Sequence, residues 1–351
     1  MDFSRPDNAR KINRLKVLDA LRKRDMSRAE LSRELVINKV SVSEITDSLI
    51  KEGFIVSGAL DNTTQGRPAT ILSIEKNGGR VFSFIFSNLN VVASASDLKG
   101  NVLRYERFPN DDNLGEYIGS FINKMTQDNP RVFGVTVIGS EKDIPKDVFP
   151  WPVIYKTRAE AQAKGEIEGR DDLGNTLFVS WGDEIEASWP KGGMLSIPTF
   201  GHMKVTKGIK CSCGGDGCLS AVASGRAIKE TTGINQYRRL LTEEKGLLAI
   251  DDISSAMAFA FSEAVQATGA DSIMIMGEMS LMPKDLYASI QDKMIMTLPP
   301  ERRRSVTLIK SEKADKALLE GAGLIALDEF FYHKEILDKL SQIQINSSFL
   351  S

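Results

Sequence analysis

Histidine and cysteine are scarce in this chain of 351 residues, which has 2 histidines and 3 cysteines. So few cysteines exclude a disulfide-stapled scaffold, and no apolar run is long enough to span a membrane. The N-terminal residues also lack the apolar segment of a secretory signal peptide. We therefore expect a cytoplasmic protein with no membrane partner, and at this length two or three domains.

The few cysteines are concentrated in one place. All three, and one of the two histidines, fall within residues 202–218. Three thiolates and one imidazole form the ligand set of a closed zinc site, which organises a loop and leaves no position for a catalytic water. The sequence predicts a structural Zn²⁺ site made by His202, Cys211, Cys213 and Cys218. The alternative is a group of three buried free thiols.

Net charge is low overall but unevenly distributed. Residues 1–70 contain 13 Lys and Arg against 10 Asp and Glu, a net charge of +3, whereas the whole chain has a net charge of −2. A mildly basic first segment on an acidic body is typical of proteins whose N-terminal domain binds a polyanion.

The first 74 residues predict a winged helix-turn-helix. Ser27 and Glu30 form a capping-box pattern, Asn38 is a candidate N-cap, and Gly53 ends the third helix. Apolar residues at helical spacing precede and follow these caps: Ile12, Leu15, Leu18, Leu21, Val42, Ile45 and Leu49. Two short strands around a polar tip follow, over residues 54–56 and 69–72.

A winged helix-turn-helix inserts the N-terminal turn of its third helix into the major groove of double-stranded DNA. The residues predicted to meet bases or phosphates are Lys39, Val40, Ser41, Ser43 and Glu44. Arg67, at the wing tip between a glycine and a proline, is predicted to enter the minor groove. The alternative is a helical protein-interaction domain whose basic residues form a solvated face.

The remaining chain predicts two α/β lobes, over residues 75–190 and 191–351. Each has buried strands followed by helices. The first lobe contains predicted strands 81–86, 91–97, 102–108 and 132–137 and a helix from about 114 to 127. The second contains predicted helices near 218–232, 252–269, 313–327 and about 330–342, and strands 272–276 and 305–309.

Three motifs together resemble the ROK family, named for repressor, open reading frame and kinase. They are Gly66-Arg67-Pro68 at the wing, Gly201-His202, and the run from Cys211 to Leu219. The resemblance covers nearly the whole chain. It implies an actin-like (ribonuclease H-like) sugar-kinase fold behind the winged helix. It also implies a repressor that binds its operator as a homodimer or homotetramer and responds to a sugar or sugar phosphate.

The kinase motifs of the family are altered in this chain. The resemblance aligns the catalytic Asn-Asp-Ala-Asn segment with residues 157–160, so that Arg158 stands where the catalytic aspartate belongs. A guanidinium cannot accept a proton at neutral pH. The two glycine-rich phosphate turns of the family correspond to residues 86–90 and 180–186, which contain a single glycine, Gly182. The resemblance therefore implies a protein without kinase activity.

The sugar-contact positions differ as well, since Thr199 and Ser220 replace two glutamates of the family. Together with Thr157, Arg158 and Glu160 they form the predicted ligand-binding set. Arg158 could receive an anionic ligand such as a sugar phosphate or an acidic sugar, because arginine binds oxyanions through two hydrogen bonds. Alternatively the pocket is vestigial and Arg158 pairs with Glu160 or another acid.

The sequence thus predicts a sequence-specific DNA-binding regulator, a repressor of sugar-metabolism genes with a catalytically inactive effector domain. Two alternatives stay open. One is an ATP-dependent sugar kinase with an attached DNA-binding domain. The other is a regulator controlled by a protein partner without a sugar ligand.

Overall fold

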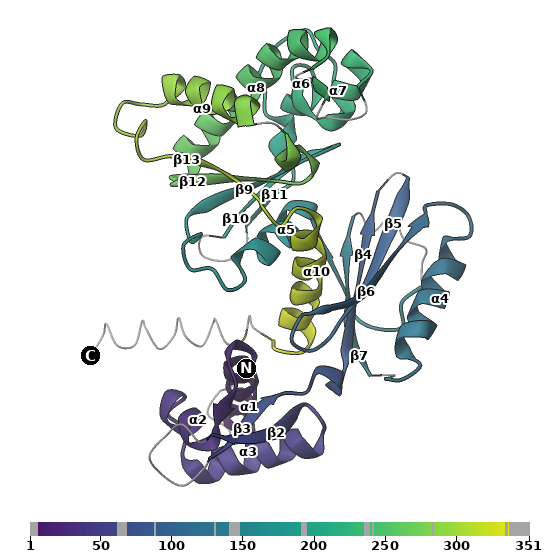
Figure 1. The fold of residues 1–351 in the computed structure, drawn as a ribbon, viewed down its shortest axis with the longest axis vertical. Coiled ribbons are helices and arrows are strands. Elements are labelled where there is room, and N and C mark those ends of the chain that lie inside the picture. The colour runs from purple at the N-terminus through teal and green to yellow at the C-terminus, as the bar shows by residue number, and fades with distance from the viewer. Residues whose placement is uncertain are drawn as a thin grey trace. The chain divides into compact units, whose positions relative to one another are not determined.

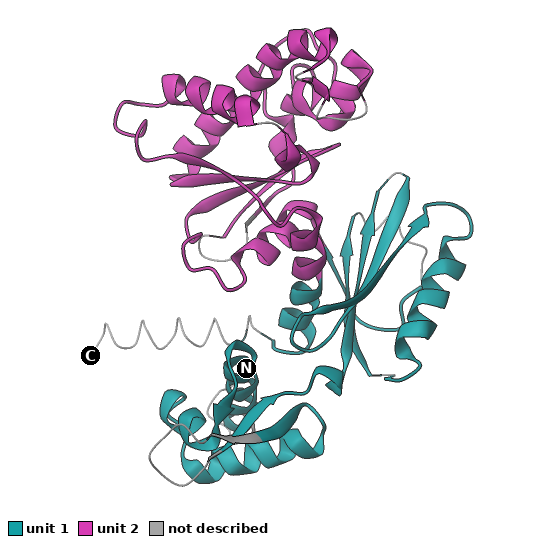
Figure 2. Cartoon of the chain, in the orientation of Figure 1, with its two compact units in different colours: residues 1–155, 323–351 teal, residues 156–322 magenta. Residues whose placement is uncertain are grey.

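A computed structural model of the chain describes residues 6–61, 69–87, 89–129, 131–139, 148–190, 195–234, 239–240, 242–282, 284–333 and 336. The chain folds into two compact units (Figure 1). Unit 1 comprises Met1–Tyr155 and Gly323–Ser351, and unit 2 comprises Lys156–Ala322 (Figure 2). Unit 2 is therefore inserted between two segments of unit 1. No helix within the described ranges is long and apolar enough to cross a membrane.

The N-terminal part of unit 1 contains three helices and a small antiparallel sheet of order β1-β3-β2. The apolar residues predicted from helical spacing contribute to its core, with Leu18, Leu21, Val42 and Leu49 almost fully buried. The elements are α1 (Pro6–Lys23), β1 (Met26–Ser27), α2 (Arg28–Glu34), α3 (Lys39–Lys51), β2 (Ile55–Asp61) and β3 (Ala69–Ile74). This order is that of a winged helix-turn-helix.

The predicted caps are confirmed. The Ser27 hydroxyl accepts the backbone N–H of Glu30, and the Glu30 carboxylate accepts the backbone N–H of Ser27. Asn38 Oδ1 accepts the Ser41 N–H at 2.8 Å at the start of α3. Gly53, just after α3, has a φ of 77°. Glycine adopts this left-handed conformation without steric strain, unlike residues that have a Cβ. Arg67, predicted at the wing tip, lies outside the described residues.

The turn between α2 and α3 is strained at Val36, a β-branched residue with a φ of 53°. We expect Val36→Gly to raise the free energy of unfolding by about 1 kcal/mol, since relief of the left-handed strain exceeds the entropy cost of glycine. Val40→Gly, inside α3, is the matched control and should lower it by about 0.5 kcal/mol. Thermal unfolding followed by circular dichroism measures both. A Val36→Gly protein that melts below the parent would contradict the prediction.

Behind the winged helix, unit 1 contains a five-stranded sheet of order β6-β5-β4-β7-β8. Helix α4 covers one face, where Phe121 packs on Phe82. The C-terminal half of α10 covers the other face, where Gly323 lies against Ser96 (Figure 1). The elements are β4 (Arg80–Phe86), β5 (Asn90–Ser96), β6 (Val102–Pro109), α4 (Leu114–Thr126), β7 (Val132–Ile138), β8 (Val153–Lys156) and α10 (Asp315–Phe330).

The winged helix packs directly on the rest of unit 1. Arg131 donates to the carbonyl oxygen of Glu52 at 2.8 Å and its guanidinium lies 5.0 Å from the centre of the Phe54 ring. Arg22 of α1 forms an ion pair with Asp328 near the end of α10. These contacts attach the winged helix to the start of β7 and to the end of α10.

Unit 2 repeats the strand order of unit 1 in a sheet of order β11-β10-β9-β12-β13. Three antiparallel strands are followed by two parallel ones. One face packs against α5 and the other against α6, α8 and α9. The elements are α5 (Arg158–Ile167), β9 (Thr176–Trp181), β10 (Ile185–Trp189), β11 (Leu195–Ile197), α6 (Leu219–Ala223), α7 (Gly225–Thr232), α8 (Glu244–Thr268), β12 (Ser272–Met276), α9 (Lys284–Thr297) and β13 (Thr307–Lys310).

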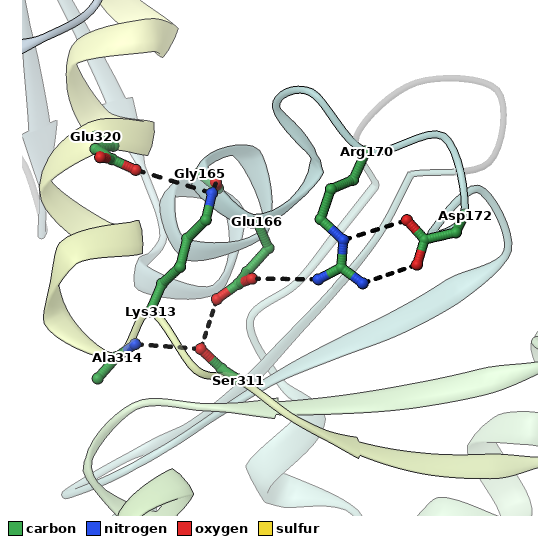
Figure 3. A network of polar contacts seen from close by, with 8 residues as sticks. All are labelled: Gly165, Glu166, Arg170, Asp172, Ser311, Lys313, Ala314 and Glu320. Atoms are coloured by element: carbon green, nitrogen blue, oxygen red, sulfur yellow. Dashed lines mark hydrogen bonds and ion pairs between the residues drawn. The ribbon is translucent and has the colours of Figure 1, made fainter.

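A buried polar network joins α5 to the segment that leads into α10 (Figure 3). The carboxylate of Glu166, almost fully buried, accepts the hydroxyl of Ser311 and lies 4.0 Å from the guanidinium of Arg170. The amine of Lys313 donates to the carbonyl oxygen of Gly165. This network fixes the start of α10 against α5 within unit 2.

Two boundaries differ from those predicted. The predicted boundary between the two lobes was after residue 190, whereas the units divide after residue 155. Strand β9 pairs in parallel with β12 and antiparallel with β10, so residues 176–189 belong to the sheet of unit 2. The helix predicted at 313–327 is α10, which begins at Asp315 and extends three residues further than predicted, to Phe330. Residues 337–342 of the helix predicted at about 330–342 lie outside the described ranges.

Candidate functional site

The four predicted metal ligands come together in one cluster on a loop of unit 2. One ligand atom from each of His202, Cys211, Cys213 and Cys218 lies within 4.8 Å of the others. The Cys211 sulfur is 3.7 Å from His202 Nδ1, and the Cys213 and Cys218 sulfurs are 3.8 Å apart. This cluster could hold a single metal ion.

The backbone of this loop brings the sulfurs together through glycines. Gly214 and Gly217 have φ values of 84° and 71°, and a Cβ at Gly217 would lie 1.8 Å from the carbonyl oxygen of Thr206. Side chains at these positions would be strained, and at Gly217 would also clash. The geometry of the loop therefore requires glycine at these two positions.

The thiols are held in unequal environments. Burial raises the pKa of the Cys211 thiol, but hydrogen bonds from the Cys213 backbone and from the Cys213, His202 and Cys218 side chains lower it to about 6. Burial raises the pKa of the Cys218 thiol, opposed by the amine of Lys204, which lies 3.2 Å from its sulfur. At neutral pH the cluster thus favours at least one thiolate, the form that binds metals.

The predicted base-reading residues all lie in the first half of α3. Lys39, Val40 and Glu44 are exposed, and Ser41 and Ser43 are partly exposed. Val42, Ile45 and Leu49 face the core, so the five predicted base-reading residues occupy the outer side of the helix. The arrangement presents a short solvent-facing surface at the N-terminal end of α3.

The predicted ligand-binding residues divide into two groups in unit 2. Thr157 caps α5 in a capping box with Glu160, whose carboxylate also pairs with Lys156 at 2.9 Å. Glu160 is therefore engaged with Lys156 and not with Arg158. Thr199 is exposed and precedes the short 3-10 helix that contains His202. Ser220 lies close to this helix, since a Cβ at Gly201 would be 2.1 Å from the Ser220 hydroxyl oxygen.

Glu186 is a residue of this region that sequence reasoning did not single out. It lies on β10, and its Oε2 accepts the Ala159 N–H of α5 at 3.2 Å. Burial raises the pKa of this carboxyl, although the Ala159 N–H and the charge of Arg158 oppose the shift. Arg158 thus has an acidic neighbour that is 28 residues away in sequence, and no local pattern could indicate the pairing.

The raised pKa of Glu186 predicts a pH-dependent stability. The pKa of Glu186 is higher in the folded protein than in the unfolded chain, so ionisation of Glu186 lowers the free energy of unfolding. The contribution of Glu186 to stability is therefore greatest in acid, where it is protonated in both states, and is lost as the pH rises through the folded-state pKa. Glu186→Gln should therefore melt above the parent at pH 8, and the two should converge below about pH 4. Glu184→Gln makes the same change at an exposed position of the hairpin and is the control. A difference in melting temperature between the parent and Glu186→Gln that does not change with pH would refute this prediction.

One family model matches part of unit 2 and the chain that follows it. The family model described as "ROK family" matches residues 190–329. The metal cluster and the second sheet of unit 2 lie within or beside this region. Residues 190–329 therefore resemble a ROK family domain. The resemblance to that family, predicted from the motifs, is confirmed.

The relatives of this chain include xylose repressors. It is 21% identical over 378 residues to the xylose repressor of Bacillus spizizenii, covering 94% of this chain and 98% of the relative. It is 25% identical over 261 residues to the xylose repressor of Caldicellulosiruptor bescii, covering 62% of this chain. The chain spans 65% of the length of this second relative.

Solved structures confirm the predicted fold class. A ROK family transcriptional regulator, described as a homologue of the Escherichia coli MLC protein, superposes with a TM-score of 0.74 at 20% identity, covering 94% of this chain and 99% of that one. A ROK hexokinase from Thermus thermophilus gives a TM-score of 0.56 at 17% identity, covering 70% of this chain and 97% of that one. The kinase shares the α/β body, while the match to the regulator extends over nearly the whole chain.

Proposed function

We propose that this protein is a sequence-specific DNA-binding repressor of sugar-metabolism genes. The observation that carries the proposal is the presence, in one chain, of a capped winged helix-turn-helix and a ROK body. The names of its relatives support it, since proteins with similarity over most of this chain are xylose repressors. Residues 1–74 are the DNA-binding part, and operator recognition uses the exposed side of α3 together with Arg67.

The repressor acts as a homodimer or homotetramer. Two copies of α3 would enter successive major grooves of a double-stranded operator, about 34 Å apart along the duplex. The contacts between α1 and the end of α10 support a route by which the body acts on the DNA-binding part, because α10 begins in unit 2 and ends in unit 1.

The body of the repressor is proposed to lack kinase activity. Arg158 begins α5 at the position where the family resemblance places a catalytic aspartate, and it cannot serve as a general base. The neighbouring carboxylates are engaged elsewhere: Glu160 binds Lys156, and Glu186 accepts the Ala159 N–H.

The effector is proposed to be a sugar, a sugar phosphate or an acidic sugar. The names of the relatives favour xylose or a related pentose. The ligand-binding residues proposed are Thr157, Arg158, Glu160, Thr199 and Ser220. The effector must bind one arrangement of the repressor more tightly than another in order to release DNA.

The metal cluster is proposed to hold a structural Zn²⁺. Three sulfurs and one imidazole nitrogen within 4.8 Å match the soft and borderline ligands that zinc prefers. The lowered pKa of Cys211 supports binding at neutral pH. With four protein ligands the ion would stabilise the loop that leads into α6 and would have no position for a reacting water.

The proposal is tested by incubating the intact protein with fragments of genomic DNA from the organism that encodes it and sequencing the fragments retained. We expect enrichment of DNA beside sugar-metabolism genes, and release of that DNA by one member of a panel of pentoses, hexoses and their phosphates. Lys39→Ala should weaken retention, whereas Lys229→Ala, the same change on α7, should not. Phosphorylation of a sugar by the pure protein with ATP, or unselective DNA retention, would contradict the proposal.

A further inference from the structure

The carboxylates of the helix-turn-helix are almost all neutralised by arginine. Four of them on α2, on α3 and at its C-cap form ion pairs with N–O distances between 2.5 and 3.3 Å: Glu30 and Glu34 with Arg24, Asp47 with Arg28, and Glu52 with Arg14. Glu44 is different. It is exposed on the first half of α3, and within the described ranges it has no ion-pair or hydrogen-bond partner.

An unpaired carboxylate on a surface that meets DNA is costly, because it repels the phosphates that supply most of the binding free energy. The four arginine pairs neutralise the other carboxylates of α2, of α3 and of its C-cap. Glu44 lacks this compensation at the place where α3 meets the groove. Such a charge is compatible with tight binding when a hydrogen-bond donor of a base satisfies it.

Val40 precedes Glu44 by one helical turn, so the two side chains lie on the same side of α3. Its side chain is 69% exposed, so its methyl groups are available for contact. An exposed aliphatic group beside an unpaired acceptor is complementary to a pair of pyrimidine edges in the major groove. Cytosine offers its N4 amino group as a donor, and thymine offers its 5-methyl group for apolar contact.

We propose that Glu44 and Val40 select the operator sequence, with Glu44 accepting a hydrogen bond from the N4 amino group of a cytosine and Val40 contacting the methyl group of a thymine. This inference rests on the proposed DNA-binding function and specifies the bases that α3 reads. Glu44 then acts in two ways. It favours the correct base, and its charge weakens binding to all other DNA. Both effects raise the affinity for the operator relative to the affinity for random DNA.

The first test is selection of 30-base-pair duplexes of random sequence by the intact parent protein and by Glu44→Ala. The parent should select a motif with a fixed cytosine. The preference of Glu44→Ala for cytosine over the other bases at that position should be about tenfold smaller than that of the parent. Glu44→Ala should also bind random DNA about fivefold more tightly at physiological salt, since one repulsive charge is removed. Asp47→Ala, which removes a charge already paired with Arg28, is the matched control and should keep the cytosine preference.

The second test removes single methyl groups from the selected duplex by replacing thymine with uracil. One position should weaken binding of the parent about fourfold, the value for one buried methyl-sized group. The same replacement should leave the affinity of Val40→Ala unchanged. Val56→Ala, at an exposed valine on β2, is the control and should keep the sensitivity.

The outcomes separate the inference from the function on which it rests. A parent protein that selects no sequence contradicts the proposed function and the inference with it. A parent that selects a motif, while Glu44→Ala keeps its cytosine preference or Val40→Ala keeps its sensitivity to uracil, contradicts the inference alone. Loss of both preferences in the respective variants supports it.

Discussion

Gly321→Ala is expected to destabilise unit 2 by at least about 3 kcal/mol, because it removes the space in which α10 crosses α5. A Cβ at Gly321 would lie 1.7 Å from the carbonyl oxygen of Ala161. On the opposite helix, a Cβ at Gly165 would lie 2.0 Å from the carbonyl oxygen of Ala317. Both clashes involve backbone atoms, so the two helices would have to separate. The polar network around Glu166 would be disrupted with them (Figure 3).

Gly119→Ala is the matched control for this prediction. Gly119 lies inside α4, and a Cβ there would meet nothing within 4 Å. The same substitution should therefore stabilise the protein by about 0.5 to 1 kcal/mol, because alanine loses less backbone entropy on folding. Urea unfolding followed by circular dichroism measures both effects. Two variants that shift in the same direction would show that the α5–α10 crossing is not as close as described.

Cys218→Ser should remove bound zinc and lower the melting temperature of unit 2 by roughly 10 °C. Loss of a metal that binds only the folded state costs the stabilisation it supplied, here at least about 3 kcal/mol, and a unit of this size loses about 2 to 4 °C per kcal/mol. The effect should be large because Cys218 is almost fully buried at the start of α6 and its sulfur lies 3.8 Å from that of Cys213.

The measurement is metal content by mass spectrometry together with the melting temperature, before and after treatment with a chelator. The parent should contain about one zinc ion per chain and should lose stability on chelation, while Cys218→Ser should not respond. Lys207→Ala, an exposed change in the same loop, should retain the metal. A parent protein that contains no zinc and is insensitive to chelation would favour the alternative of free thiols.

Local features were predictable from the sequence because their causes are local. The capping box of Ser27 and Glu30, the Asn38 cap and the end of α3 at Gly53 each depend on atoms within a few residues. The metal cluster was predictable for a related reason. Its ligands are rare residue types gathered on one short segment, so that their spacing alone indicates a common partner.

Long-range features were not predictable in the same way. The unit boundary at residue 155 depends on the pairing of β9 with β12, whose residues are 96 positions apart, as in the pair Thr176 and Ser272. Glu186 meets the start of α5 from another strand, and no periodicity encodes that contact. The capping box of Thr157 and Glu160 has the usual three-residue spacing, and the pairing of Glu160 with Lys156 follows the i,i+4 rule, yet the family resemblance assigned Glu160 to a ligand pocket.

The proposed repressor function requires that the protein recognise a specific DNA sequence. The most direct measurement is the ratio of its dissociation constants for its selected duplex and for random DNA of equal length, determined by fluorescence anisotropy at physiological salt. We predict a ratio of at least about 1,000 in favour of the selected sequence. Equal affinity for the two duplexes, or no binding to either, would show that the protein is not a sequence-specific DNA-binding repressor.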